Sequence, residues 1–289
     1  MEQPAIKLSL DRDIGILMFL WQWKVATTAM LGLRFYGSDQ STGIYQRLCR
    51  LDKAGYIQPR SGSRGEHYAW TLTGRGFQTI EGRLPKLIEN GYRSENLGHD
   101  LLVSAIHLGD WIGGIPQGCG VFTEQQLRRL PVESYPEWVP QTTRHRPDGY
   151  WRVPGANKPR VIALEVELSR KTDRDYQAVA EFYQAWKRIY RVLWVVSQPQ
   201  DAALLAAKLK SVTDGDADYH NFLTVNQLIQ YGWQAKVNRG KDQGTSVADL
   251  LYDRAMTRPL PVIGKSLMNA AKCPYKAAGY AVFSPSDFR

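Results

Sequence analysis

The chain of 289 residues carries a formal net charge of +9, with 43% hydrophobic and 22% charged residues. This size fits one large or two ordinary domains, and no segment approaches the roughly 18 uninterrupted apolar residues that a membrane span requires. The three cysteines lack metal-ligand spacing, which argues against a zinc ribbon or disulfide scaffold and fits a reducing cytoplasm, and the basic charge favours a polyanionic partner such as nucleic acid, or an anionic membrane surface.

The first 82 residues carry the signals of three short helices followed by a hairpin. Apolar residues recur at three- and four-residue spacing between Ile14 and Trp21, a second helix is expected at about 25–33, and a third begins near Ser38 and ends at Gly55. The stretch "YIQPRSGSRGEHYAWTLTGRG" then gives a strand, a turn and a strand. This order predicts a winged helix-turn-helix DNA-binding domain over residues 1–82.

The third helix is expected to read DNA with its polar side. Ile44, Leu48 and Leu51 form one apolar stripe, so the opposite side faces away from the core. The residues expected to contact DNA are Thr42, Gln46, Arg50 and Lys53 on this helix, and Arg60 and Arg64 in the turn of the hairpin. Two alternatives stay open: a mixed-charge face is often simply solvated, and some winged helices bind proteins.

After a linker at about 82–95, the sequence predicts a helix in "SENLGHDLLVSAIHLGDWI", which carries His99. A histidine in such a helix is more often structural than catalytic. A short apolar strand follows in "GVFT", and Thr123 is expected to cap a helix that begins near Glu124.

Two glutamates stand on one side of a strand whose other side is apolar. "RPDGYWRV" and "RVIALEVEL" read as two strands joined by a turn rich in Pro, Gly and Asn. Glu165 and Glu167 are about 6.6–7 Å apart at Cα in such a strand, and the hairpin is expected to place Asp148 beside them. Carboxylates that converge in this way are suited to Mg²⁺, or to Mn²⁺ in its place.

A metal ion held by Asp148, Glu165 and Glu167 points to hydrolysis or nicking of a phosphodiester. The ion would orient the phosphate, lower the pKa of a bound water and stabilise charge on the attacking and leaving oxygens. In the alternative interpretation, the two glutamates lie on an exposed sheet edge and form salt bridges with Arg146, Lys158 or Lys171.

The remaining pattern predicts helix, buried strand, helix and strand after residue 171. The expected fold class is therefore α+β or α/β, with a mixed sheet flanked by helices over residues 96–240. A C-terminal extension over 241–289 contains one clear helix, in "SVADLLYDRAM".

The second half resembles the PD-(D/E)xK nuclease superfamily, through Pro147-Asp148 and Glu165-Val166-Glu167. The order of elements over about residues 14–200 resembles the replication-relaxation family, which includes mobilization relaxases of the MobC type. Further matching segments are "YQRLCRLDKAGYI", "GHD" at His99 and "FTEQQLR" at Glu124 and Arg128.

This resemblance implies a restriction-endonuclease-like domain that nicks double-stranded DNA at an origin of transfer. The implied catalytic residues are Asp148, Glu165, Glu167, Lys171, Glu124 and His99. Coupling or accessory mobilization proteins are the implied partners, and a homodimer is left open.

One position departs from the nuclease pattern, because Glu167 stands where a lysine is usual. Lys171 could supply the positive charge from a later position. The five histidines contain no His-x-His pair, which disfavours relaxase chemistry based on a histidine cluster and a tyrosine nucleophile. The alternatives are a DNA-binding replication or transcription regulator with a degenerate, non-cutting nuclease fold, and a restriction or defence nuclease.

Overall fold

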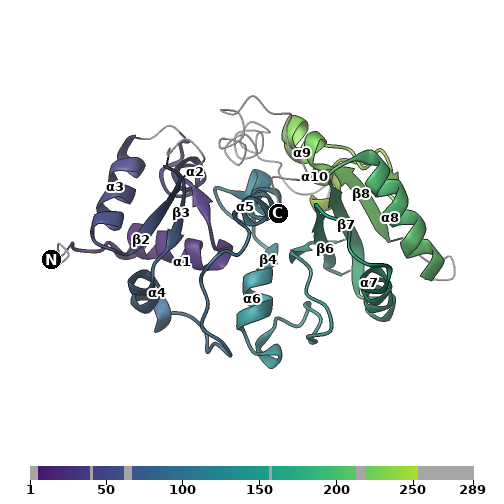
Figure 1. The fold of residues 1–289 in the computed structure, drawn as a ribbon, viewed down its shortest axis with the longest axis horizontal. Helices are drawn as coiled ribbons and strands as arrows, with labels where there is room; N and C mark the ends of the chain where they lie inside the picture. Colours follow the sequence, from purple (N-terminus) through teal and green to yellow (C-terminus); the bar gives the residue numbers. More distant parts are fainter. Residues whose placement is uncertain (1–5, 40–41, 62–66, 156–157, 213–218, 253–289) are drawn as a thin grey trace.

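The computed structural model describes residues 6–39, 42–61, 67–155, 158–212 and 219–252. In these ranges a three-stranded sheet lies among the N-terminal helices, and a six-stranded sheet lies between layers of helices (Figure 1). Helices α5 (Leu97–Leu108) and α6 (Glu124–Arg129) stand between the two groups of elements in this view.

The N-terminal elements follow the order helix, strand, helix, helix, strand, strand, helix. Their antiparallel sheet has the strand order β1-β3-β2. The bounds are α1 (Gly15–Trp23), β1 (Ala26–Thr27), α2 (Thr28–Tyr36), α3 (Thr42–Lys53), β2 (Ile57–Ser61), β3 (His67–Leu72) and α4 (Gly74–Glu81). The second helix begins three residues later than the sequence suggested, because Thr27 caps it by accepting a hydrogen bond from the Met30 N–H.

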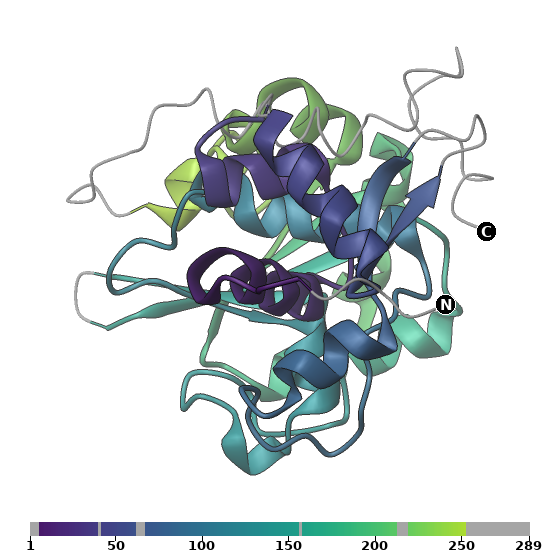
Figure 2. The ribbon, with the colours of Figure 1, turned by 90° about the vertical axis from the view of Figure 1, so that its left-hand side faces the viewer.

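Helix α1 is buried on nearly all sides. Ile16, Leu17, Leu20 and Trp23 are among its buried residues, and the helix packs against α4, β3, α5 and α6. A helix that is apolar all round belongs inside a core. Seen from the N-terminal side, the dark purple α1 lies near the centre of the view, with other N-terminal helices above and below it (Figure 2).

The second sheet is mixed, with the strand order β4-β5-β6-β7-β8-β9. Strands β4, β5 and β6 are antiparallel, β6, β7 and β8 are parallel, and β9 is antiparallel to β8. The bounds are β4 (Gly120–Thr123), β5 (Gly149–Val153), β6 (Arg160–Glu167), β7 (Ile189–Val196), β8 (His220–Thr224) and β9 (Arg239–Gly240). This mixed α and β architecture is compatible with a restriction-endonuclease-like fold.

Strand β6 is central and is covered on both faces. Ile162 and Leu164 join the core that includes α5, α9 (Val225–Tyr231) and α10 (Val247–Leu251). Val161 and Ala163 join a second core beneath α7 (Asp173–Ala185) and α8 (Pro199–Val212). The predicted alternation is therefore confirmed, but the exposed-edge interpretation of the glutamates is wrong, because Glu165 and Glu167 are only 4% and 8% exposed.

The N-terminal elements and the six-stranded sheet share one hydrophobic core. That core runs from Ile14 through α5 to Tyr252, so packing crosses the expected linker at 82–95. It also crosses the expected boundary at 241, since α10 is buried there. Residues 253–289 of the expected extension lie outside the described ranges. None of the described helices is long and apolar enough to cross a membrane.

Candidate functional site

The carboxylates singled out from the sequence gather where β6 ends and β5 begins. The Asp148 N–H donates to the Leu164 carbonyl at 3.0 Å, which extends the β5–β6 pairing by one residue. Asp148 Oδ2 accepts a hydrogen bond of 2.6 Å from the N–H of Val166, the residue between the two glutamates. The hairpin thus fixes Asp148 against the Glu165–Glu167 segment, as its length and register predict.

Glu165 is held by a histidine and a tyrosine. Its Oε1 lies 2.5 Å from His145 Nε2 and accepts a hydrogen bond from the Tyr183 hydroxyl of α7. Burial alone would raise the pKa of Glu165, but His145, Lys171 and the tyrosine hydroxyl together lower it. Glu165 is therefore a buried, charged carboxylate whose orientation is fixed from the α7 side.

Glu167 forms an ion pair with Lys171. The Lys171 Nζ lies 2.9 Å from Glu167 Oε2, and the Lys171 N–H donates to the Tyr176 hydroxyl at 3.0 Å. Burial, with smaller contributions from Glu165 and Asp148, raises the pKa of Glu167 against the pull of Lys171. Despite its own burial, Lys171 has a raised pKa because Glu167, Glu165 and Asp148 surround its ammonium group. A positive charge is thus present at this end of β6, supplied four residues after Glu167.

Among the three cations of the alternative interpretation, the structure pairs only Lys171 with a glutamate. The Arg146 Nε instead donates to the Leu127 carbonyl at 3.2 Å. Lys158 lines a cavity at the other end of β6.

His99, at the start of α5, reaches the cluster through Asp148. Its Nε2 lies 3.3 Å from Asp148 Oδ1 and its Nδ1 3.7 Å from Asp100 Oδ1. Burial would lower the pKa of His99, but the two carboxylates raise it to about 10. The imidazole is therefore a cation at neutral pH.

The Glu124 side chain is bound by Lys24 and Arg128. The Lys24 Nζ lies 2.6 Å from Asp100 Oδ1 and 2.9 Å from Glu124 Oε2, and Arg128 pairs with Glu124 at 2.8 Å. Burial opposes ionisation of Glu124, yet these two cations lower its pKa. A cavity of about 240 Å³ lies here, and Lys24, His99, Asp100, Glu124 and Arg128 are among its lining residues.

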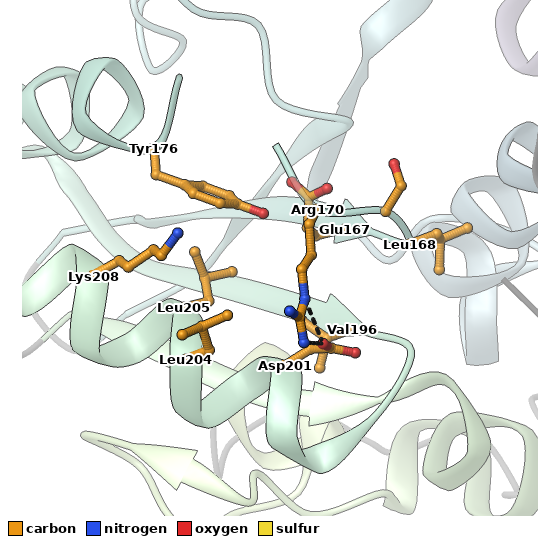
Figure 3. A pocket seen from close by; sticks show the side chains of 10 residues that line it. Glu167, Leu168, Arg170, Tyr176, Val196, Asp201, Leu204, Leu205 and Lys208 are labelled. Carbon is orange, nitrogen blue, oxygen red and sulfur yellow. Dashed lines mark hydrogen bonds and ion pairs between the residues drawn. The ribbon is translucent and has the colours of Figure 1, made fainter. Parts of the chain in front are cut away.

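A smaller cavity has Glu167 in its lining. It measures about 30 Å³, and Arg170, Tyr176, Asp201 and Lys208 are among its walls (Figure 3). In Figure 3 the Arg170 side chain extends toward Asp201 of α8, to which its Nη2 is bonded at 3.2 Å. This volume suffices for a water molecule and is too small for a nucleotide.

The residues expected to read DNA lie on a separate part of the molecule. Thr42, Gln46, Arg50 and Lys53 are all exposed on α3, opposite the buried Ile44, Leu48 and Leu51. Helix α3 lies at the outer edge of the N-terminal elements, away from β6 (Figure 1). Arg60 is half-buried on β2, and Arg64 lies outside the described residues.

The chemistry of the three carboxylates suits a hard divalent cation, but their arrangement does not converge on one point. Asp148, Glu165 and Glu167 offer the oxygen donors that Mg²⁺ and Mn²⁺ prefer. Each of them is directed to partners of its own. Asp148 contacts His99 and the Val166 N–H, Glu165 contacts His145 and Tyr183, and Glu167 contacts Lys171. Within the described residues, no group of three or more His, Cys, Asp or Glu side chains is arranged to hold a metal ion.

Three residues of this network were not singled out from the sequence. His145 stands three residues before Asp148, and this closeness to "PD" was a usable signal. Tyr183 and Lys24 gave no such signal, since they reach the cluster from α7 and from the end of α1.

No family model and no curated protein matches this chain. Among solved structures, restriction endonuclease FokI bound to DNA is similar with a TM-score of 0.25 and 12% identity, over 79% of this chain and 46% of that chain. The chain thus spans about half of that protein's length, and a similarity of this size carries no argument about fold or activity. Membership of the replication-relaxation family stays a prediction.

Proposed function

We propose that the protein is a DNA-binding, metal-dependent endonuclease. The observation that carries the proposal is the meeting of Asp148, Glu165, Glu167 and Lys171 at the end of one central strand. A buried carboxylate cluster with a lysine among its charges is costly for stability and suited to phosphodiester chemistry.

In this proposal Asp148 and Glu165 are the first ligands of Mg²⁺ or Mn²⁺. When bound, the ion would orient a phosphate and activate a water. His145 and Tyr183 keep the Glu165 carboxylate in place, because both contact its Oε1. Glu167 would hold the attacking water, and Lys171, its ion-pair partner, would stabilise negative charge on the phosphate. His99 and Glu124 would act from the neighbouring cavity, His99 by releasing Asp148 to the cation.

DNA recognition is assigned to a winged helix-turn-helix formed by α1–α4 and β1–β3. The order of helices and strands supports this assignment, and so does the exposed row of Thr42, Gln46, Arg50 and Lys53 on α3. In this geometry Gln46 and Arg50 would reach base edges.

A plasmid-nicking assay tests the proposal. Supercoiled plasmid is incubated with Mg²⁺ or Mn²⁺ and wild-type protein, and with the variants Asp148→Asn and Glu165→Gln. We expect both variants to lose cleavage by more than about a hundredfold, while duplex binding by anisotropy stays within twofold. Glu181→Gln, which removes the charge of an exposed carboxylate of α7, serves as the matched control and should cut like the wild type.

Arg50→Ala should instead weaken duplex binding by about 1–3 kcal/mol. Absence of cutting by the wild type with either metal would overturn the proposal.

The finer assignment is a relaxase that nicks an origin of transfer, working with coupling or accessory mobilization proteins. It rests on the resemblance of the sequence motifs. A plasmid carrying the cognate origin should be converted to the open circle and not to the linear form. Equal cutting of both strands would favour a restriction or defence nuclease.

The second candidate is a DNA-binding regulator with a degenerate nuclease fold. One observation favours it: each carboxylate of the cluster is already paired with a basic side chain of this protein. The partners of Asp148, Glu165 and Glu167 are His99, His145 and Lys171, respectively. If the protein is such a regulator, Glu165→Gln would leave its control of replication or transcription in the cell unchanged, whereas Arg50→Ala would abolish that control.

A further inference from the structure

A second charged cavity lies at the opposite end of the same strands from the carboxylate cluster. It measures about 410 Å³ and is lined by Glu137, Trp138, Arg152, Lys158, Pro159, Val161 and Arg188. The register places Arg152 opposite both Gly120 of β4 and Val161 of β6, and Val161 pairs with Ile189, which follows Arg188. The cavity therefore lies where β4, β6 and β7 begin and β5 ends.

The cations of this cavity come from three separate segments. Arg152 is the penultimate residue of β5, Lys158 belongs to the turn before β6, and Arg188 precedes β7. Throughout the described ranges, no carboxylate lies within ion-pair distance of any of the three, although Glu137 contributes to the lining. Three cations and one carboxylate give the cavity an excess of positive charge, which attracts an anion.

An aromatic wall accompanies these cations. The Trp138 indole is partly exposed, and its ring lies edge-on to buried Phe122, with the centroids 6.3 Å apart and the planes at 82°. A Cβ at Gly120 would lie 3.3 Å from the indole Cζ2, so the absence of a side chain there leaves room for the ring. An indole beside basic side chains can stack on a base while the phosphates meet the cations.

We propose that this cavity binds a nucleotide unit, with its base against Trp138 and its phosphate against Arg152, Lys158 and Arg188. The volume lies within the range of small-molecule sites, about 300–1,000 Å³. The ligand is a segment of single-stranded nucleic acid or a free nucleotide, since both present the same chemistry. The site is separate from the carboxylate cluster, because β6 extends roughly 23 Å between Arg160 and Glu167 at about 3.3 Å per residue.

The test measures binding by the full-length protein in EDTA, so that no cleavage takes part and a failed nicking assay does not affect it. The probes are a fluorescent six-nucleotide single strand, too short to form the duplex that α3 would read, and thymidine diphosphate as competitor. We expect Lys158→Gln with Arg188→Gln to weaken binding of the strand at least tenfold. The slope of the logarithm of the binding constant against the logarithm of the salt concentration should also become shallower by about 1.4, at roughly 0.7 per lost phosphate contact. The control pair Lys210→Gln with Lys236→Gln removes the same charge from exposed positions outside the cavity and should change affinity less than twofold.

The outcomes separate the two sources of the ligand. If thymidine diphosphate competes with the strand in the wild type but not in the double variant, the cavity is a free-nucleotide site. If the strand binds and thymidine diphosphate does not compete, the cavity is a nucleic-acid contact. Trp138→Leu should weaken either probe at least fivefold through the lost stacking. Binding of both probes by the double variant within twofold of the wild type would overturn the proposal, as would an equal loss in the control pair.

Discussion

Lys24 has a backbone φ of 64°, the left-handed conformation that glycine adopts most readily. It is the first residue after α1, and its ammonium group joins Asp100 of α5 to Glu124 of α6. With ψ at −32°, this sparsely populated backbone conformation costs about 1–3 kcal/mol in a residue with a side chain. The two buried ion pairs hold it, so this one residue connects the N-terminal elements to the helices beside the carboxylate cluster.

Removing the Lys24 charge should destabilise the protein. In Lys24→Met, the carboxylates of Asp100 and Glu124 keep their burial and lose a cation, which we expect to cost about 3–5 kcal/mol. Urea unfolding at neutral pH measures the change. Lys208→Met is the matched control, because its partner Asp173 is 83% exposed and the loss should stay below about 1 kcal/mol. Equal effects of the two variants would contradict the role assigned to Lys24.

His220 makes the fold sensitive to acid. Burial lowers the pKa of His220 to about 3, and its Nδ1 accepts a hydrogen bond of 2.9 Å from the Trp194 indole. The folded-state pKa lies below the unfolded value of about 6.5. The stability that neutral His220 contributes to the fold is therefore complete above pH 6.5 and is lost as the pH falls toward 3.

The variant His220→Asn tests this titration, because an amide oxygen can replace Nδ1 as the acceptor for Trp194 and does not titrate. The unfolding free energy of the wild type should fall by roughly 2 kcal/mol more than that of the variant between pH 7 and pH 4.5. Urea unfolding at both pH values gives the difference. Parallel pH profiles would show that His220 does not bind its proton on unfolding.

At the scale of elements, Gly76 allows α4 to pack closely against the backbone of Tyr56, the residue before β2. A Cβ at Gly76 would lie 1.9 Å from the Tyr56 carbonyl oxygen, whereas one at Gly82 would meet nothing within 4 Å. Gly76→Ala should therefore lower the melting temperature through overpacking, with a loss of about 1–3 kcal/mol. Gly82→Ala, at the end of the same helix, should be neutral or stabilising by up to about 1 kcal/mol. Calorimetry of both variants checks the contrast.

The strand with the glutamates shows how far sequence patterns reach. Alternation along β6 predicted both of its faces, because side chains in a strand must point to opposite sides. The expected hairpin predicted the approach of Asp148. Alternation does not show how many layers cover a strand, so the exposed edge remained an open interpretation that burial of Glu165 overturns.

Other features required tertiary contacts that no local pattern carries. His145, Tyr183 and Lys24 come from a loop and two different helices, and only folding brings them to the carboxylates. Helix α1 was expected from apolar residues at three- and four-residue spacing between Ile14 and Trp21. The largely apolar composition of "GILMFLWQW" reflects burial on nearly every side.

At the scale of the whole molecule, one core joins elements that the sequence divides at 82–95. Because α1 and α5 belong to the same packed cluster as β6, we expect a single cooperative unfolding transition. Hydrogen exchange in urea, followed by mass spectrometry, should give β3 and β7 the same opening free energy. Opening of β3 at a lower urea concentration would mean that the N-terminal elements unfold by themselves.

The buried position of α1 also limits how such a protein can be re-engineered or can diverge. An exchange of the N-terminal elements at residues 82–95 would take α1 with it and remove Trp23, Leu20 and Lys24 from contacts in the centre of the molecule. If α3 reads DNA as proposed, a new target would be acquired most readily by substitutions on its exposed side, which carries Gln46 and Arg50. Grafting experiments should keep residues 14–36 of the host and replace only α3 and the hairpin that follows it.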